Sequence, residues 1–248
     1  MYPKWRGFYG AVTLAASLGF LGCGNSGNTF VRVVNASPGL SNFSVVVGQT
    51  GVASSLPYGT EGVTPKGDNY SVTDSSGNYR PVGAGSNMAT KVIGTQGSTA
   101  LATATQTYRK NGQYTIVSIA PAPSIQLQIL TDSNVSPPSG QYQLRFMDTS
   151  VRSGAIDVYI TAAGGTVVGA TPVIANINFQ GVVTNPQSPG TLEIQVTPHG
   201  NQADVLAKMP FSPAGGKDYS VFFLDPPNSG SLAYGILVVN DPISTAKM

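Results

Sequence analysis

Two stretches of this 248-residue chain carry the same pattern, and this repeat constrains the fold more than any other feature. Residues 29–49 align without gaps with 142–162, and residues 114–132 align with 219–241 after a few inserted residues. A period of about 110 residues indicates a duplicated domain, because the repeats of solenoids run about 20–50 residues. We therefore expect two units of about 100 residues, each large enough to bury a core of its own.

Short apolar runs separated by turn-forming residues dominate the chain after its N-terminal segment. Gly, Ser, Thr, Asn and Pro recur every 8–12 residues or so, and the runs between them are rich in Val, Ile, Thr and Tyr. Apolar and polar residues alternate in several runs: Val31/Val33, Phe43/Val45/Val47, Ile125/Leu127/Ile129, Leu144/Phe146, Ile156/Val158/Ile160 and Leu192/Ile194/Val196. Such alternation is typical of strands that are half buried against another sheet. The pattern predicts an all-β fold of two tandem β-sandwich domains.

The composition of the connecting segments suggests where these domains begin and end. Residues 133–141 are polar and rich in proline, which is typical of a semi-stiff linker. The first domain is therefore expected at 29–132 and the second at 142–248. Residues 35–39 are expected to form a tight turn, since Pro and Gly favour turn backbone angles. The Gly- and Ser-rich stretch 83–98 is expected to be a loop or an edge.

The first 22 residues have the layout of a secretory signal peptide. Lys4 and Arg6 form a short basic region, and the 15 uncharged, mostly apolar residues 8–22 follow it. As a helix this run would measure about 23 Å, which is shorter than the ~30 Å hydrocarbon core of a bilayer. We therefore expect residues 1–22 to be a cleaved signal peptide and not a membrane span.

Cys23 is the only cysteine and is followed by a polar stretch. The sequence Phe-Leu-Gly-Cys at 20–23 resembles the lipobox of bacterial lipoproteins. In that class of proteins the cysteine becomes the lipidated N-terminus, so the resemblance implies a lipidated tether at 23–28. Several acyl chains anchor a protein stably, whereas one chain alone is marginal. Gly24, in place of the Asp that signals inner-membrane retention, favours the outer membrane or the cell surface.

Three short motifs resemble the DUF4397 family. That family typically has a His/Asn-Ala-Ser-Pro turn, then an Asp-Val-Tyr-Val strand, then a short Tyr-Gly segment. The first half of the chain has Asn-Ala-Ser-Pro at 35–38 and Tyr-Gly at 58–59, and the second half has Asp-Val-Tyr-Ile at 157–160. At 148–151 the second half has Asp-Thr-Ser-Val where the turn motif belongs. The resemblance implies Ig-like β-sandwich domains, often in tandem, in bacterial envelope or secreted proteins, and it implies no activity.

Charge and ligand counts argue against several classes of function. Loss of the leader removes two of 13 basic residues and leaves 11 against 11 acidic residues without a basic cluster, which argues against nucleic-acid binding. One His and one Cys are too few for a zinc site. The polar residues near strand ends that could bind calcium lack a repeated Asp motif and are interpreted as turn formers: Asp74, Asn78, Asp132, Asn134, Asp225 and Asp241. We expect no metal and no cofactor.

Two further sets of residues leave alternatives open. His199, the only histidine, could serve a hydrolase with Asp204 or Asp218 as its partner. The chain has no Gly-x-Ser-x-Gly motif, so we interpret His199 as a solvated turn residue. Arg32 and Arg145 lie at equivalent positions and serve either a shared docking role or, as we favour, a bond to a neighbouring strand.

The sequence therefore predicts a non-enzymatic lipoprotein of the bacterial cell envelope that displays a structural or binding module on the outer membrane or cell surface. Its partners would be the membrane, through the lipid on Cys23, and a protein or glycan ligand. Sandwich folds commonly bind through loops and sheet faces held on a rigid scaffold. The alternatives are a hydrolase-type enzyme that uses His199 with nearby Asp residues, and an accessory subunit of an outer-membrane complex.

Overall fold

The structure, a computed structural model, contains seventeen strands and no helix within the residues that it describes, which confirms the all-β expectation. In this part of the chain no helix is long and apolar enough to cross a bilayer. The described residues are 27–40, 43–54, 56–62, 79–94, 99–132, 135–228, 230–231 and 233–241. The expected signal peptide and Cys23 lie outside these ranges.

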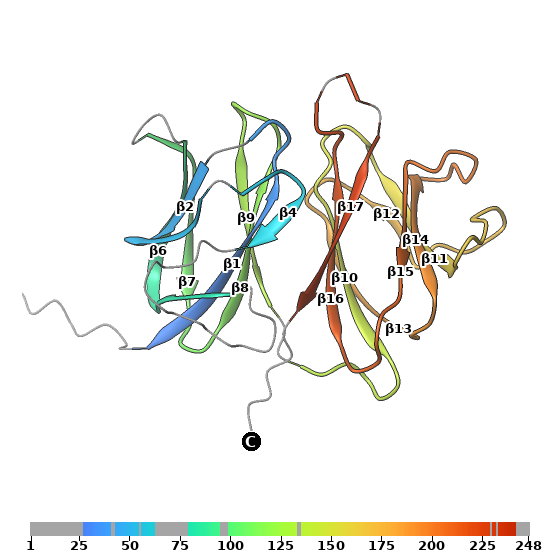
Figure 1. Cartoon of the computed structure of the whole chain (residues 1–248), viewed down its shortest axis with the longest axis horizontal. Coiled ribbons are helices and arrows are strands. Elements are labelled where there is room, and N and C mark those ends of the chain that lie inside the picture. The colour runs from blue at the N-terminus through green and yellow to red at the C-terminus, as the bar shows by residue number, and fades with distance from the viewer. Residues whose placement is uncertain are drawn as a thin grey trace, which may run out of the picture.

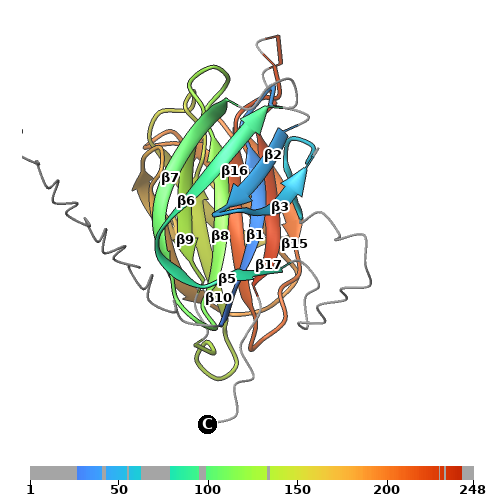
Figure 2. The same ribbon diagram turned by 90° about the vertical axis from the view of Figure 1, so that its left-hand side faces the viewer.

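Residues 28–131 form two sheets. The first inner sheet has the strand order β4-β1-β8-β9, with β5 also paired to β1, and the first outer sheet has the order β3-β2-β6-β7. The strands are β1 (Asn28–Ala36), β2 (Phe43–Val47), β3 (Thr50–Ser54), β4 (Thr60–Gly62), β5 (Arg80–Gly83), β6 (Gly85–Gly94), β7 (Ala100–Tyr108), β8 (Gln113–Ile119) and β9 (Gln126–Thr131). Figure 2 looks onto the first outer sheet.

Residues 142–241 form two more sheets. The second inner sheet has the order β13-β10-β16-β17, and the second outer sheet has the order β12-β11-β14-β15. The strands are β10 (Tyr142–Asp148), β11 (Ile156–Ala162), β12 (Ile174–Ile177), β13 (Val182–Gln187), β14 (Leu192–Pro198), β15 (Ala207–Phe211), β16 (Asp218–Leu224) and β17 (Gly235–Asp241). In Figure 1 the two inner sheets face each other at the centre and the outer sheets lie on either side.

The two halves have the same strand order. In both inner sheets the first strand runs parallel to a late strand, β1 beside β8 and β10 beside β16, whereas every other described pair is antiparallel. This order differs from that of an immunoglobulin constant domain, in which the second and third strands lie in opposite sheets. Here β2 and β3 are neighbours in one sheet. The strand order is therefore not that of an immunoglobulin constant domain.

Each half encloses a core between its inner and outer sheets. The first core contains Val31 of β1 and Phe43 of β2, and the second contains Leu144 of β10 and Val158 of β11. All of the alternating apolar residues predicted from the sequence lie in these two cores or pack against them. Alternation therefore identified correctly which face of each strand is buried inside its own half.

A third apolar cluster lies between the two inner sheets. Its buried members come from both halves: Val34, Ala36, Val117, Ile119, Leu130, Met147, Phe222, Leu224 and Val239. Strands β8 and β16 are consequently buried on both faces, so adjacent residues such as Phe222 and Phe223 face different cores. The two halves are thus joined by a continuous apolar contact, and β1, β8, β10 and β16 lie at the centre of the molecule.

Two local expectations have opposite outcomes. Residues 35–39 form the predicted turn, in which Gly39 has φ +75° and Leu40 N donates to Ser37 O at 3.1 Å. The expectation of a loop or edge at 83–98 is wrong for 85–94, which form β6 between β2 and β7. The register shifts between Gly85 and Met88, and the strand then places the fully buried Val92 in the first core. Burial of this apolar segment outweighs the low strand propensity of its glycines.

Candidate functional site

An arginine on the first strand of each inner sheet points away from its own core. Arg32 lies on β1 between Val31 and Val33, which both face the first core. Its side chain is 0% exposed because the second inner sheet covers it. Arg145 has the matching place on β10, and its side chain is 11% exposed. Both arginines therefore lie in the contact between the halves.

Arg32 bonds first to its own half and then to the other. Its Nε donates to Thr115 Oγ1 on the neighbouring β8 at 2.8 Å, which is the cross-strand bond that the sequence analysis favoured. Its terminal nitrogens then donate to Asn240 O at 2.9 Å and to the carboxylate of Asp241, both on β17. Glu61 lies 3.5 Å away at the edge of the contact. The bond to Thr115 is the cross-strand bond that the sequence favoured, and the bonds to Asn240 and Asp241 join the same residue to the other half.

Arg145 makes the equivalent bonds from the second half to the first. Its Nε donates to Ser220 Oγ on β16 at 2.8 Å, and its Nη2 donates to Asp132 Oδ1, at the end of β9, at 2.6 Å. The hydroxyl groups complete the network, since Thr115 donates to Asp132 at 2.8 Å and Ser220 donates to Asp241 at 2.6 Å. Each half therefore contributes one arginine, one hydroxyl and one aspartate.

The two halves exchange their ion pairs. Arg32 binds the aspartate of the second half, Asp241, and Arg145 binds the aspartate of the first half, Asp132. A two-fold interface has this property, because residue i contacts j while the other copy's j contacts i. Buried charges contribute to stability only when they are paired and fully hydrogen-bonded. The four charges satisfy each other only while the two halves are docked.

Tyr79 closes the network on the side of the first half. Its hydroxyl donates to Asp132 Oδ2 at 2.7 Å, and the guanidinium carbon of Arg32 lies 5.0 Å from its ring centroid. Burial by itself would lower the pKa of Arg32, but Asp241, Tyr79, Asp132 and Glu61 together raise it. Arg32 is therefore a permanent cation in the contact. Burial and the nearby Asp132 carboxylate raise the pKa of Tyr79, which stays protonated and donates.

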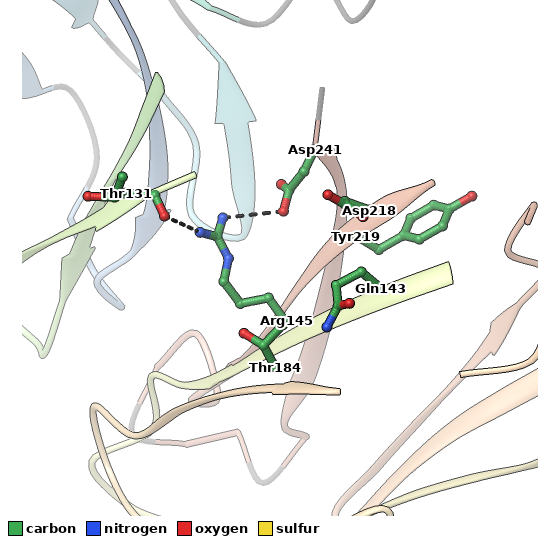
Figure 3. Close-up of a pocket in the computed structure, with 7 residues that line it drawn as sticks. All are labelled: Thr131, Gln143, Arg145, Thr184, Asp218, Tyr219 and Asp241. Carbon is green, nitrogen blue, oxygen red and sulfur yellow. Dashed lines mark hydrogen bonds and ion pairs between the residues drawn. The ribbon is translucent and has the colours of Figure 1, made fainter. Parts of the chain in front are cut away.

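A cavity of about 90 Å³ takes the corresponding place on the side of the second half (Figure 3). Arg145 lies at its wall and bonds to Thr131 O at 3.3 Å and to Asp241 Oδ2 at 3.3 Å. The residues that line it are Thr131, Gln143, Arg145, Thr184, Asp218, Tyr219 and Asp241. Thr131 and Thr184 are exposed and form its rim.

Asp218 is the unusual member of this lining. The residue is only 3% exposed, and neither of its carboxylate oxygens has a hydrogen-bond partner among the described residues. Burial and the neighbouring Asp241 raise the pKa of Asp218 to about 6, although Arg145 acts in the opposite direction. The equivalent residue of the first half is Gln113, a neutral amide, because Gln113 and Asp218 begin the two parallel strands β8 and β16.

Asp148, at the end of β10, is a second buried carboxyl group. One oxygen accepts the Ser150 N–H at 2.9 Å, and the other has no partner among the described residues. Burial and the nearby Asp225 raise the pKa of Asp148 to about 7, against the effect of the Ser150 bond. Asp225 itself accepts from Ser150 Oγ and from the Val151 N–H at 3.0 Å. This pair shapes the turn that follows β10.

His199 pairs with an aspartate that the sequence analysis did not name. Its Nδ1 lies 2.9 Å from Asp157 Oδ1, and its side chain is 49% exposed. Burial acts against ionisation of Asp157, but bonds from the Gly200 N–H, His199 and the Asn176 N–H outweigh it and lower the pKa of Asp157. The structure thus gives His199 neither Asp204 nor Asp218 as its partner.

The other predicted site residues are dispersed. Asp132 and Asp241 belong to the network, and Asp225 belongs to a turn, so these three calcium candidates serve other contacts. In the described part of the chain no three His, Cys, Asp or Glu residues are grouped to hold a metal ion. Cys23 and the remaining candidates, Asp74, Asn78 and Asn134, lie outside the described residues.

The sequence contained two signals for the network. The repeat aligns Arg32 with Arg145, and its closing segments both end in an aspartate, Asp132 and Asp241. The second signal is that β16 is apolar on both faces, which is typical of a strand covered on both sides. No pattern distinguished Asp218, because its importance depends on the cavity beside it.

The fold and the site define an all-β protein whose two halves are locked by exchanged ion pairs and an apolar contact. The chain belongs to the family described as a domain of unknown function, DUF4397, whose model matches residues 29–159. The matched range begins in β1 and ends in β11, so it includes both Arg32 and Arg145. No curated protein matches the chain.

Solved structures give only distant similarity. The chain is similar to the Bacillus anthracis TIE protein with a TM-score of 0.25 and 12% identity, covering 80% of this chain and 34% of that one. It therefore spans about a third of the length of that protein. It is also similar to a candidate adhesin from Bacteroides ovatus with a TM-score of 0.19 and 9% identity, covering 89% of this chain and 96% of that one.

Proposed function

We propose that the protein is a lipid-anchored module of the bacterial cell envelope, built from two tandem β-sandwich domains that present a rigid surface to a protein or glycan partner. The contact between the halves is the observation that carries this proposal. Four paired charged side chains and nine apolar ones lie in this contact, which is a costly arrangement for two domains that move independently. A rigid scaffold holds its binding loops at a fixed geometry.

The tandem organisation rests on the repeat and on the shared strand order. The two halves align over their first two strands and their last two, and each contains a core between two sheets. The network uses equivalent residues of both copies. We propose a duplication of one sandwich, followed by docking of the copies through their inner sheets.

The anchor rests on the sequence of the leader. Basic residues, a short apolar run and Phe-Leu-Gly-Cys at 20–23 together have the layout of a lipoprotein signal. The Gly/Asn/Ser tether that follows would hold the rigid module a short distance from the bilayer. Lipidation of Cys23 would place the module at the outer membrane or the cell surface.

Mass spectrometry of the protein purified from its native membranes tests the anchor. The expected N-terminal fragment begins at Cys23 and carries acyl chains, and a Cys23→Ser variant should accumulate with its leader uncleaved. A chain that begins elsewhere and carries no lipid would contradict the anchored module and favour a freely secreted protein. Pull-down from surface extracts, with the lipid removed, would then identify the ligand class.

The hydrogen bond between His199 and Asp157 favours a hydrolase as the second candidate. An aspartate that fixes the Nδ1 side of an exposed imidazole is one part of a general-base arrangement. A His199→Ala variant discriminates between the two candidates. Loss of a hydrolytic activity of the native protein, with the fold intact by NMR, would support the enzyme, whereas retention of activity would remove His199 from its mechanism.

A further inference from the structure

The cavity beside Arg145 contains a buried negative charge that the protein does not neutralise. Among the buried charges of the contact, the cations are Arg32 and Arg145, and the carboxylates are Asp132, Asp241 and Asp218. Two positive charges therefore face three negative ones, even without Glu61 at the edge. An unpaired buried charge is costly, so a protein either protonates it or gives it a counter-ion.

The partners of the first four groups are already complete. Asp132 accepts from Arg145, Thr115 and Tyr79, and Asp241 accepts from Arg32 and Ser220. Asp218 has no such bond: both of its oxygens are buried without a hydrogen-bond partner among the described residues, and the residue belongs to the lining of the cavity. Arg145 directs its guanidinium to Asp132 and, as Figure 3 shows, to Thr131 and Asp241. The unused acceptors of the site are therefore those of Asp218.

The cavity exists because the residue that lies beside the arginine is large in the first half and small in the second. In the first half Tyr79 directly precedes Arg80, which pairs with Val31, and its ring covers Arg32. In the second half the residue paired with Arg145 is Thr184, whose side chain is much smaller. The space that Tyr79 fills in one half is open in the other, and its floor carries Asp218 where the first half has Gln113.

We propose that this cavity binds a primary ammonium group, with Asp218 as its counter-ion. An ammonium has three N–H donors and no acceptor, which suits two free carboxylate oxygens and the side-chain oxygen of Gln143 or Thr184. The cavity of about 90 Å³ is well above the ~10–15 Å³ that one water needs, so it has room for the head of an alkylamine. The ring of Tyr219 supplies an apolar wall.

One positive charge suits the site better than two. A single ammonium brings the buried charges to neutrality, three against three. A divalent metal would leave an excess positive charge beside Arg145, and the described residues offer no group of three acidic or His ligands. The ammonium can belong to a free amine or to a lysine side chain of a partner protein, and both present the same chemistry to Asp218.

Isothermal titration calorimetry of the full mature chain with n-butylammonium chloride at pH 7.5 and constant ionic strength tests the proposal. We expect a dissociation constant of about 1 mM, an affinity appropriate for a small head group. Asp218→Asn should weaken binding at least tenfold. This variant should fold, since the equivalent position of the first half carries the neutral Gln113. Asp204→Asn removes an exposed carboxylate and should leave binding unchanged.

Two further ligands test whether binding requires N–H donors and whether the natural ammonium group belongs to a lysine side chain or to a free amine. Tetramethylammonium chloride has no N–H donor and should bind at least tenfold more weakly than butylammonium. N-acetyl-lysine methylamide should bind if the natural ligand is a lysine side chain and should not bind if it is a free amine. Absence of butylammonium binding, equal binding by Asp218→Asn, or equal competition by potassium chloride would each overturn the proposal.

Discussion

The two halves of the molecule have the same strand order and share the Arg–hydroxyl–Asp arrangement, but they differ in what covers the arginine of each half. The first half covers its arginine with Tyr79, whereas the second leaves a cavity beside Thr184. Arg32 is consequently 0% exposed and Arg145 is 11% exposed. The shared residues hold the two halves together, and the residue that differs decides whether the site is sealed or open.

A second difference lies at the ends of β1 and β10. Asn35 Oδ1 accepts the Ser37 N–H at 3.1 Å, just as Asp148 Oδ1 accepts the Ser150 N–H at 2.9 Å. The amide of Asn35 also donates to Leu40 O and Leu56 O, both at 2.9 Å. A carboxylate cannot donate such bonds. The side chain of Asn35 is therefore bonded through both its oxygen and its nitrogen, whereas the pKa of the Asp148 carboxyl is raised.

The largest expected effect is a difference in stability between variants of the two arginines. Arg32→Met should lower the free energy of unfolding by about 3–5 kcal/mol, because it leaves Asp241 buried without its main partner. Arg145→Met should cost only about 1–3 kcal/mol, since water can enter the cavity and solvate Asp132 and Asp241. Urea unfolding of both variants measures the difference. Equal losses would show that the cavity provides no such solvation.

The next largest effect is expected when the residue that begins the turn of one half, Asp148, is replaced by the residue type found in the other half at Asn35. Asp148→Asn should raise the free energy of unfolding at pH 8 by about 2–4 kcal/mol, as expected for a pKa that is about 3 units higher in the folded than in the unfolded state. The unfolded carboxyl titrates near pH 4, so the stability from its protonated form is present below about pH 4 and is lost as pH rises through about 7.

The pH profile of unfolding is the measurement for this exchange. The variant should be more stable than the native chain at pH 8, and the two should converge at pH 4. The reciprocal variant, Asn35→Asp, should gain the pH dependence that Asp148→Asn loses. A constant difference between Asp148→Asn and the native chain across this pH range would contradict the assignment to Asp148.

A smaller effect concerns the side chain that closes the first half. Tyr79→Phe keeps the ring over Arg32 and removes only the bond to Asp132, so it should cost about 1.5 kcal/mol, the lower end for a bond to a charged group. Thermal unfolding measures this loss. Ser220→Ala, which removes a hydroxyl from the other half of the network, is the matched control and should cost at least as much. No loss in Tyr79→Phe would mean that Asp132 is satisfied without it.

The smallest effect is expected at the surface of the second half. His199→Ala should cost about 0.5 kcal/mol near pH 6, because the pair with Asp157 is half exposed. Asp157 has a lowered pKa, so its stabilisation is present above about pH 4 and is lost as pH falls through its folded-state pKa. In an NMR titration the variant should shift the midpoint of Asp157 upward.

The sequence by itself determined the all-β class, the buried face of the strands in which apolar residues alternate, and the residues that the two halves share. These features depend on short-range patterns, since alternation with period two and turn residues act over a few positions. The repeat even placed Arg32 with Arg145 and Asp132 with Asp241.

Only the tertiary structure decided which residues meet across the contact. Arg32 and Asp241 are 209 positions apart, and nothing local selects Asp241 over Asp132 as its partner. The strand order likewise depends on which sheet edges meet, and no local pattern specifies it. Asp218 could not be identified from the sequence for the same reason. Its charge is unpaired beside a cavity that forms where a bulky neighbour is absent. A sequence shows which residues are present, but not the space between them in the folded chain.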